Sequence, residues 1–337
     1  MVVEELKETE SRKKDHINLA FKSQLEKLDN RFFYEPMLSG HPDSMNNPID
    51  FLGKKLSQQF WISSMTGGTA VAADLNHRLA RSCKKFGFGM GLGSCRIILD
   101  DKTFFNDFNL RPILGDDLPF YANIGVAQLE ELIADKALYK LDQLIADLDC
   151  DGLIIHVNPL QEWTQPEGDR FQFAPIDTIK QVLDHVKFPI IVKEVGQGLG
   201  YESLKTLFEL PLAAIDFGAH GGTNFSLMEL QRGSDERKDA MMPLAYIGHS
   251  AEEMVDFTNA IVDDLGDKRM CNQVIVSGGM KNYLDGFYCV SKLKIPAIYG
   301  QAAPILKRAI ESEEVLNEYL EMQFQGFSMA KSILKVR

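Results

Sequence analysis

The sequence predicts an α/β protein built as a (β/α)8 TIM barrel with an N-terminal helical extension. Eight short runs rich in β-branched or aromatic residues recur along the chain, and each ends in a glycine or polar cluster. Stretches with the apolar spacing of an amphipathic helix separate most of these runs. Strand and helix alternating eight times indicates a parallel barrel, and the chain of 337 residues is long enough for one.

The predicted elements follow one another at regular spacing. The strands are predicted over 60–64, 87–91, 120–124, 153–157, 189–193, 213–217, 273–277 and 297–300. The helices between them are predicted over 72–85, 128–146, 176–186, 201–210, 251–265 and 282–291. Most strands start within roughly forty residues of the one before, but the sixth and seventh are further apart. The excess, 224–242, is polar, so we expect an extended loop or lid within 223–245 that orders when a ligand binds.

No change in composition requires a second domain. Residues 1–58 are predicted to form an extension with a helix over 14–24, and this extension is expected to contribute to the substrate site. The barrel itself is expected over 59–311, followed by a C-terminal helix over 312–337. The whole chain is therefore predicted to be one domain.

Charge and composition exclude several classes of protein. The chain has 48 acidic and 36 basic residues and a net charge of −12, which would repel a nucleic acid. Five scattered cysteines without a CxxC pair favour reduced thiols over a disulfide framework or a zinc site. Neither a signal peptide nor an apolar run of about 18 residues is found, so we expect a cytoplasmic protein without a membrane partner.

Functional residues of such a barrel lie at the carboxyl ends of its strands. His156 and Asn158 close the fourth run two residues apart, so their side chains point the same way, and Gln161 and Glu162 follow directly. Oxygen ligands suit Mg²⁺, while His and Asn side chains can donate to phosphate oxygens. This cluster predicts a site for a phosphate and a divalent metal together. The alternative is a loop whose polar groups satisfy one another.

Lys193 closes the fifth run, at the mouth of the predicted barrel. A buried ammonium group needs a partner that compensates its charge. Two interpretations are open: an ion pair with Glu194 or Asp216, and contact with the N1/O2 edge of a flavin.

Glycine-rich turns and basic residues provide candidate anion sites. Glycine-rich turns lie at 64–68, 218–224 and 277–281, and the loops after strands seven and eight of such barrels frequently bind phosphate. At the N-terminus, the basic cluster 12–16 is either a solvated helix face or a clamp for a diphosphate, and Arg96 after the second run could act in the same way.

Together, these motifs resemble the type 2 isopentenyl-diphosphate isomerases, which are FMN-dependent barrels. The matching motifs keep their order over about 12–305. They are RKxDHI (12–17), MTGG (65–68), GSxR (ending at Arg96), HxNPLQE (156–162), QPEGDR (165–170), VKEVG (around Lys193), GGTN (221–224) and SGG (277–279).

The resemblance implies reversible isomerisation of isopentenyl diphosphate to dimethylallyl diphosphate. The cofactors would be Mg²⁺ and reduced FMN, with NADPH as the reductant, and the flavin would act as acid and base, assisted by Gln161. The implied substrate-binding residues are Arg12, Lys13, His16, Arg96, His156, Asn158 and Gln161, with Glu162 as the metal ligand. The implied FMN-binding residues are Met65, Thr66, Gly67, Ser94, Asn123, Lys193, Thr223, Gly278, Gly279, Ala302 and Ala303. A homo-oligomer, tetramer or octamer, is also implied.

Two positions depart from the family pattern. Cys95 stands in GSCR where the family commonly has Gln, and a free thiol there could be oxidised. His220 precedes the GGTN motif, as in FMN-dependent 2-hydroxy-acid oxidases, where this His is the base and an Arg after HGG binds the substrate carboxylate. Thr223 takes the place of that Arg. The alternatives to the isomerase are therefore such an oxidoreductase using His220, and a flavin-binding barrel that has lost catalysis.

Overall fold

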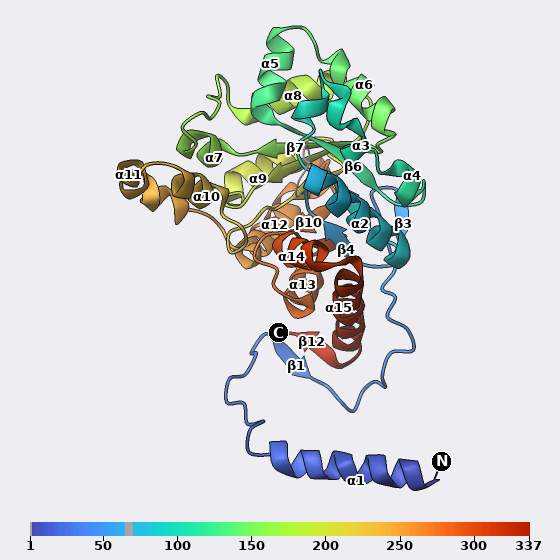
Figure 1. Cartoon of the computed structure of the whole chain (residues 1–337). Helices are drawn as coiled ribbons and strands as arrows, with labels where there is room; N and C mark the ends of the chain where they lie inside the picture. Colours follow the sequence, from blue (N-terminus) through green and yellow to red (C-terminus); the bar gives the residue numbers. More distant parts are fainter. Residues whose placement is uncertain (1, 65–69) are drawn as a thin grey trace.

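The computed structural model describes residues 2–64 and 70–337, and its centre is a closed barrel of eight parallel strands surrounded by helices (Figure 1). Each strand pairs with the next in chain order, and the last pairs with the first. The strands are β4 (Phe60–Ile62), β5 (Gly89–Gly91), β6 (Phe120–Gly125), β7 (Gly152–Val157), β8 (Ile190–Glu194), β9 (Ala214–Asp216), β10 (Val274–Val276) and β11 (Ala297–Gln301). The predicted fold class is confirmed, and all eight strands fall within or next to the predicted ranges.

The helices that cover the barrel follow the strands. They are α2 (Ala70–Phe86), α5 (Val126–Ala134), α6 (Tyr139–Leu148), α8 (Pro175–His185), α9 (Tyr201–Phe208), α12 (Ala251–Leu265), α13 (Tyr283–Lys292) and α14 (Ala303–Glu311). Shorter helices are α3 (Phe105–Phe108), α4 (Arg111–Leu114) and α7 (Pro159–Thr164). The single helix predicted over 128–146 is divided, because Lys136 between α5 and α6 has a φ of 56°.

A hairpin of β2 (Ile49–Phe51) and β3 (Lys54–Leu56) lies at the amino ends of the barrel strands. The backbone N–H of Leu52 donates to the side chain of Gln273, just before β10, and Lys54 donates to the carbonyl of Leu118, just before β6. Phe51 and Leu56 are fully buried. Since the hairpin packs against this end, the opposite end, where the strands finish, is the one that can carry a site.

The C-terminal helix α15 (Glu313–Ile333) packs across the barrel through aromatic side chains. The ring of Phe324 lies 5.5 Å from that of Phe60 on β4 and 5.6 Å from that of Phe88, which precedes β5. After α15, β12 (Leu334–Val336) pairs with β1 (Phe32–Tyr34), so the two ends of the folded body lie together.

The segment after β9 corrects the prediction of an extended loop within 223–245. It forms two helices, α10 (Phe225–Arg232) and α11 (Asp235–Ala245). The side chain of Asn224 accepts the N–H of Leu227, and the side chain of Ser234 accepts that of Arg237. These two N-caps satisfy helix-terminal N–H groups, which is how a largely polar segment becomes helical.

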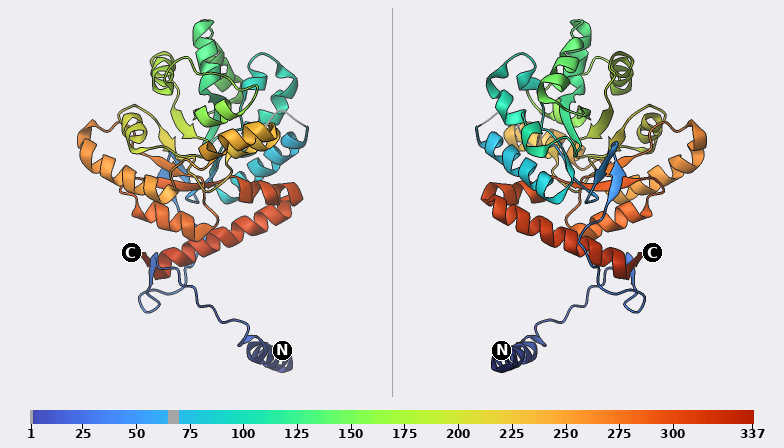
Figure 2. Two further views of the ribbon diagram at one scale, coloured as in Figure 1. Left: turned by 90° about the vertical axis from the view of Figure 1, so that its left-hand side faces the viewer. Right: turned by 90° about the vertical axis from the view of Figure 1, so that its right-hand side faces the viewer.

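The N-terminal helix α1 (Val2–Leu19) lies apart from the barrel in every view (Figures 1 and 2). It begins and ends earlier in the chain than the predicted 14–24. Within the described part of the chain, no helix combines the length and apolar character needed to cross a membrane.

Candidate active site

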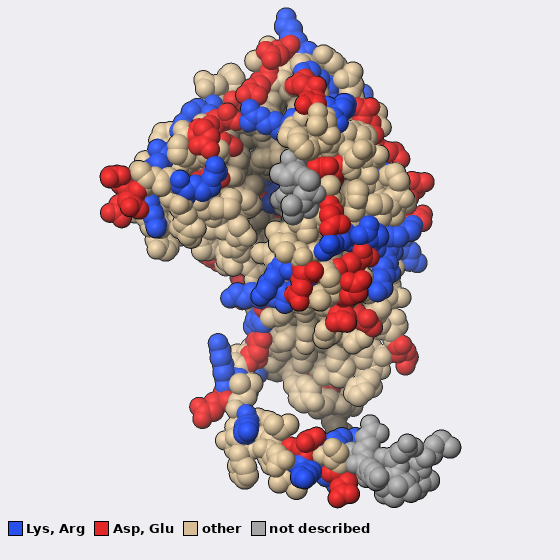
Figure 3. Space-filling view, in the orientation of Figure 1, with Lys and Arg blue, Asp and Glu red and all other residues tan. Residues whose placement is uncertain are grey.

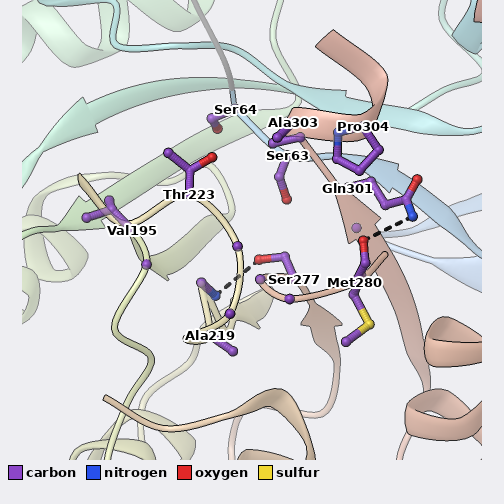
Figure 4. A pocket seen from close by; sticks show the side chains of 18 of the residues that line it. Ser63, Ser64, Val195, Ala219, Thr223, Ser277, Met280, Gln301, Ala303 and Pro304 are labelled. Carbon is purple, nitrogen blue, oxygen red and sulfur yellow. Dashed lines mark hydrogen bonds between the residues drawn. The ribbon is translucent and has the colours of Figure 1, made fainter. Parts of the chain in front are cut away.

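A cavity of about 530 Å³ opens at the carboxyl ends of β4, β8, β9, β10 and β11 (Figure 4). Its wall consists mainly of the loops that follow these strands, including 221–223, 278–281 and 302–304. The molecule is hollowed on this face, and basic and acidic side chains both stand around the hollow (Figure 3). A volume of this size suits a ligand of cofactor size.

The structure brings together six of the residues implied to bind FMN: Lys193, Thr223, Gly278, Gly279, Ala302 and Ala303 all line the cavity. Met65, Thr66 and Gly67 lie outside the described residues. Ser94 and Asn123 are not among the lining residues of this cavity. Ser94 is exposed and accepts the N–H of Arg96, whereas Asn123 is buried and bonded to His156.

Some polar groups of the cavity wall can form hydrogen bonds with a ligand. The buried hydroxyl of Ser64, which lines the cavity, has no hydrogen-bond partner. Helix α14 starts at Ala303 without a side-chain cap. Pro304 has no N–H and the N–H of Ile305 already donates to the carbonyl of Ala302, so of the first three residues only Ala303 has an N–H left for an anion. A Cβ atom added at Gly222 would lie 3.1 Å from the backbone nitrogen of Gly279, so these two loops approach each other closely and a side chain there would crowd them. The cavity could hold a phosphorylated ligand with a polar edge.

Lys193 lies on the floor of the cavity and is 8% exposed. Its Nζ donates to the main-chain carbonyl of Glu194 at 2.7 Å. The carboxylate of Glu194 does not pair with Lys193, because one of its oxygens accepts the N–H groups of Gly196, Gln197 and Gly198 at 2.6, 2.6 and 2.9 Å. Asp216, the other partner considered, is the neighbour of Lys193 across β8 and β9, but among the described residues the two side chains form no ion pair.

The predicted phosphate and metal cluster forms at the end of β7 and on α7. Asn158 is buried, and its Nδ2 donates to Glu162 Oε1 at 2.8 Å and to Gln161 Oε1 at 3.2 Å. Glu162 Oε2 accepts the N–H of Asp169 at 2.8 Å. Asn158 Oδ1 is buried without a partner. The polar groups therefore satisfy one another only in part.

Among the described residues, no group of three or more His, Cys, Asp or Glu side chains could hold a metal ion by itself. Mg²⁺ is commonly bound through one or two carboxylates together with the phosphates of a substrate. Glu162, with the unpartnered amide oxygen of Asn158 close by, fits a metal that arrives with a diphosphate.

His156 is held as a neutral ring in a defined orientation. Asn123 Nδ2 donates to the carbonyl of Leu92, so its Oδ1 faces His156 Nδ1 at 2.7 Å and Nδ1 carries the proton. Burial, and then the charge of Lys193, lower the pKa of His156 to about 4. The neutral ring thus presents Nε2 as an acceptor, and donation to a phosphate oxygen requires the protonated ring.

Arg96 stands at the rim beside this cluster. Its side chain is about half exposed and pairs with Asp169 at 3.1 Å, and Gln128 donates to the same carboxylate oxygen at 3.0 Å. Because Asp169 also bonds to Glu162 through its backbone, Arg96 and Glu162 share a neighbour. Cys95 next to Arg96 is fully buried, and burial raises the pKa of its thiol to about 12, which disfavours the reactive thiolate.

The structure does not bring Arg12, Lys13 and His16 to the cavity. All three are exposed on α1, away from the barrel (Figure 2). The first tie to the body after α1 is Arg31, which pairs with Asp285 at 2.9 Å in a smaller hollow next to the glycine loops. The fourteen residues between His16 and Arg31 could span up to about 50 Å if extended, so the cluster can reach the cavity.

His220 does not line the main cavity. It lies in the smaller hollow with Arg31 and Ser250, which shares the glycine loops at 221 and 278–279 with the main cavity. Its N–H donates to the carbonyl of His249. The residue that suggested a 2-hydroxy-acid oxidase is therefore not part of the wall of the candidate cofactor site.

The sequence did not predict some of the polar contacts at the candidate site. Ser63 and Ser277 line the cavity and both bond to the buried Asp216, and Gln161 Nε2 donates to Glu229 on α10 at 3.4 Å. Asp216 was considered only as an ion-pair partner of Lys193, and its hydrogen bonds with Ser63 and Ser277 were not predicted. Glu229 had no sequence signal, because the segment that carries it was predicted to be an extended loop.

Curated proteins of known name resemble the chain in sequence over most of its length. No family model matches the chain. The isopentenyl-diphosphate delta-isomerase of Rickettsia africae (strain ESF-5) is 34% identical over 323 residues, covering 92% of this chain and 89% of that protein. The enzyme of the same name from Rickettsia prowazekii (strain Madrid E) is 33% identical over 313 residues, covering 92% and 86%.

Solved structures share the fold at low sequence identity. A mandelate oxidase variant with an FMN adduct has a TM-score of 0.56 at 14% identity and covers 91% of this chain and 88% of its own. A flavocytochrome b2 variant with pyruvate bound has a TM-score of 0.62 at 16% identity, with 90% and 72% covered. These likenesses concern the barrel alone. By the identity to curated relatives over most of both sequences, the chain belongs to the isopentenyl-diphosphate delta-isomerase family.

Proposed function

We propose that this protein is a type 2, FMN-dependent isopentenyl-diphosphate isomerase that converts isopentenyl diphosphate reversibly to dimethylallyl diphosphate. One observation carries the proposal: a glycine-lined cavity with Lys193 on its floor opens at the same end of the barrel as the cluster of His156, Asn158 and Glu162. The first suits a phosphorylated cofactor, and the second suits a diphosphate with its metal. The FMN adduct of the mandelate oxidase that shares this fold supports the choice of cofactor.

The cofactor, when bound in its reduced form, supplies the acid and base for moving a proton between two carbon atoms. The chain's own residues would bind and orient both ligands. The loops after β10 and β11 would hold the cofactor phosphate, and Lys193 would face the N1/O2 edge of the ring. Of the other implied FMN residues, Asn123 would act indirectly, by fixing the orientation of His156.

The substrate diphosphate would lie over the end of β7. Glu162 would bind Mg²⁺, Asn158 and His156 would contact phosphate oxygens, and Arg96 would close the site from the rim. Gln161 would lie by the reacting carbons. Arg12, Lys13 and His16 are proposed to complete the site when the N-terminal arm folds over the barrel mouth. We further propose NADPH as the reductant and a tetramer or octamer as the assembly.

The runner-up function is a 2-hydroxy-acid oxidoreductase. The fold likeness to mandelate oxidase and flavocytochrome b2 favours it, as does His220. Against it, His220 lines the smaller hollow and Thr223 stands where the oxidases have an Arg. A barrel that binds flavin without turnover is the third possibility.

The test is an anaerobic incubation with isopentenyl diphosphate, Mg²⁺ and FMN, with and without NADPH or dithionite, in which formation of the dimethylallyl isomer is followed. Product that forms only with reduced FMN supports the proposal. Product without flavin would refute the type 2 assignment. Flavin reduction by a 2-hydroxy acid, without isomerisation, would favour the oxidoreductase, and bound FMN without either reaction would favour the silent barrel.

A further inference from the structure

The N-terminal arm, which consists of α1 and the chain that follows it, carries apolar side chains that the structure leaves in solvent. Ile17, Phe21, Leu25 and Leu28 are between 72 and 84% exposed. Their sequence spacing would place them on one face of a helix, as an apolar stripe. Helix α1 ends at Leu19, so only the first of the four lies on a formed helix. A continuous apolar surface of this kind normally marks contact with another surface.

An apolar groove lies between α8 and α9, beside the candidate active site. Helix α8 packs mainly on α5 and α9 mainly on α12, so the helical layer is open between α8 and α9. The groove has a volume of about 590 Å³ and extends to α7, the helix that carries Gln161 and Glu162. One of its ends therefore lies at the predicted diphosphate and metal cluster. Its apolar lining includes Leu160, Ile176, Ile179, Leu199, Leu207 and Ile247.

The other end of the groove lies close to the point where the arm is attached. Residues 247–249 line the groove, and Ser250 directly after them lines the smaller hollow that contains Arg31. Arg31 is held there by its ion pair with Asp285. Tyr246, at the start of the same loop, is 76% exposed. A track with apolar side chains thus leads from the attachment of the arm to α7.

The arm is long enough to cover this track. Residues 17–28 would form a helix about 18 Å long, and the three residues from Leu28 to Arg31 can span about 10 Å. Arg31 is bound at the start of α13, which packs on α12, and α12 packs on α9. At about 8 to 10 Å between packed helices, the groove beyond α9 lies about 16 to 30 Å from α13. The basic cluster 12–16 directly precedes the stripe, so a docked stripe brings this cluster to the α7 end.

The arm and the rest of the chain carry opposite charge. Residues 12–28 contain five basic and two acidic residues, whereas the rest of the chain contains 31 basic and 46 acidic residues. The exposed Glu202 is among the residues that line the groove. This difference in charge favours contact between the arm and the barrel.

We propose that the apolar stripe docks in the groove between α8 and α9 of its own chain and thereby places Arg12, Lys13 and His16 at the diphosphate beside α7. The inference rests on the proposed function and names the surface that the arm uses. The stripe contacts neither substrate nor cofactor, so its members are positioning residues that act through the basic cluster. Because the arm is detached in the free chain, binding of the diphosphate shifts it toward the docked state.

The first test measures KM for isopentenyl diphosphate in the reduced, FMN-loaded holoenzyme with Mg²⁺. Leu25→Glu in the stripe and Ile247→Glu in the groove should each raise KM about tenfold or more and leave FMN binding unchanged. The double variant should exceed the stronger single variant by no more than about twofold, because both changes break the same contact. Met322→Glu on α15 is the matched control, since Met322 and Ile247 are both 60% exposed, and it should keep the wild-type KM.

The second test measures docking without catalysis. Lys22 and Lys27 lie between the stripe residues and are exposed, so trypsin can cleave the detached arm after them. Inorganic diphosphate with Mg²⁺ should slow this cleavage about fivefold or more in the wild type but not in Leu25→Glu.

A third test distinguishes the chain's own groove from that of a neighbouring copy. Oligomers are mixed from Glu162→Gln and Leu25→Glu chains with different affinity tags and are purified through both tags. If each arm serves its own chain, no site combines an intact arm with Glu162, and activity at low substrate concentration stays near the mean of the two parents. Activity several-fold above that mean would assign the arm to a neighbouring copy and overturn the inference, whereas an active wild-type monomer would support it directly.

The outcomes separate the inference from the proposed function. A wild-type KM in Leu25→Glu and Ile247→Glu, an equal rise in Met322→Glu, or proteolysis that diphosphate does not slow would overturn the inference and leave FMN-dependent isomerisation intact. A wild type whose arm is protected by diphosphate but which forms no dimethylallyl diphosphate would refute the proposed function and still support docking of the arm.

Discussion

His156 gives the structure a pH dependence whose size can be worked out. The ring has an ordinary pKa of 6.5 in the unfolded chain and about 4 in the folded protein, because burial and the charge of Lys193 oppose its protonation. Between these values, the unfolded chain binds a proton that the folded protein does not. The stability contributed by the neutral ring is therefore present above pH 6.5 and is lost as the pH falls toward 4.

The difference of about 2.5 pKa units corresponds to about 3.4 kcal/mol once both states are protonated. Most of this contribution to the free energy of unfolding is lost between pH 7 and pH 4.5. Since the side chain is only partly exposed, we expect the free energy of unfolding to decrease by about 2 kcal/mol because of this residue.

The assay is urea unfolding of wild type and His156→Asn at a series of pH values from 7 to 4.5. The amide of Asn can replace the Nδ1–H donor toward Asn123 but does not titrate. Other carboxylates contribute equally to both proteins, so the stability difference between wild type and variant should shrink by about 2 kcal/mol as the pH falls. His185→Asn is the control, because His185 on α8 has a side chain that is 41% exposed. Parallel stability curves for wild type and His156→Asn would refute the assigned neutral state.

Four further predictions concern function and packing. Glu162→Gln should raise the Mg²⁺ concentration needed for activity about tenfold or more and leave FMN binding unchanged; unchanged Mg²⁺ dependence would remove Glu162 from the metal site. Arg12→Ala should raise KM for isopentenyl diphosphate about 10- to 150-fold, the loss of a charged hydrogen bond of about 1.5 to 3 kcal/mol; a wild-type KM would make the cluster a solvated face. Inorganic diphosphate should bind more tightly at pH 6 than at pH 8, and less so in His156→Asn, because the ring must gain a proton to donate; calorimetry at both pH values checks this. Phe324→Ala should destabilise the fold by about 3 to 5 kcal/mol in urea unfolding, since Phe324 is 1% exposed among three aromatic rings, and a loss below 1 kcal/mol would contradict its role in the core.

The barrel could be predicted because its signal is local. Strands covered on both faces read as apolar runs, and the residue that ends each run is already at the mouth. Lys193, the cluster from His156 to Glu162, and the glycine loops were located by this reasoning alone. The helices α10 and α11 were missed because their segment is polar and their stability depends on the caps at Asn224 and Ser234.

Other features depend on contacts between distant parts of the chain. The orientation of His156 is set by Asn123 on β6, which is set in turn by the carbonyl of Leu92 after β5. No periodicity within one segment contains that information. The position of Arg12 and its neighbours could not be predicted from the sequence either. The N-terminal arm that carries them first contacts the barrel through the ion pair of Arg31 with Asp285.

His156, Lys193 and Asp216 are neighbours on β7, β8 and β9. Adjacent parallel strands place an imidazole, an ammonium and a carboxylate side by side at one depth of the barrel. Burial, and after it the charge of the ammonium, lower the pKa of the imidazole, whereas burial raises the pKa of the carboxylate and the ammonium opposes that rise. An arriving diphosphate would add negative charge on the imidazole side and so favour protonation of His156 there. Proton uptake on substrate binding should consequently be assigned to His156 and be absent in His156→Asn, which calorimetry in buffers of different ionisation enthalpy can decide.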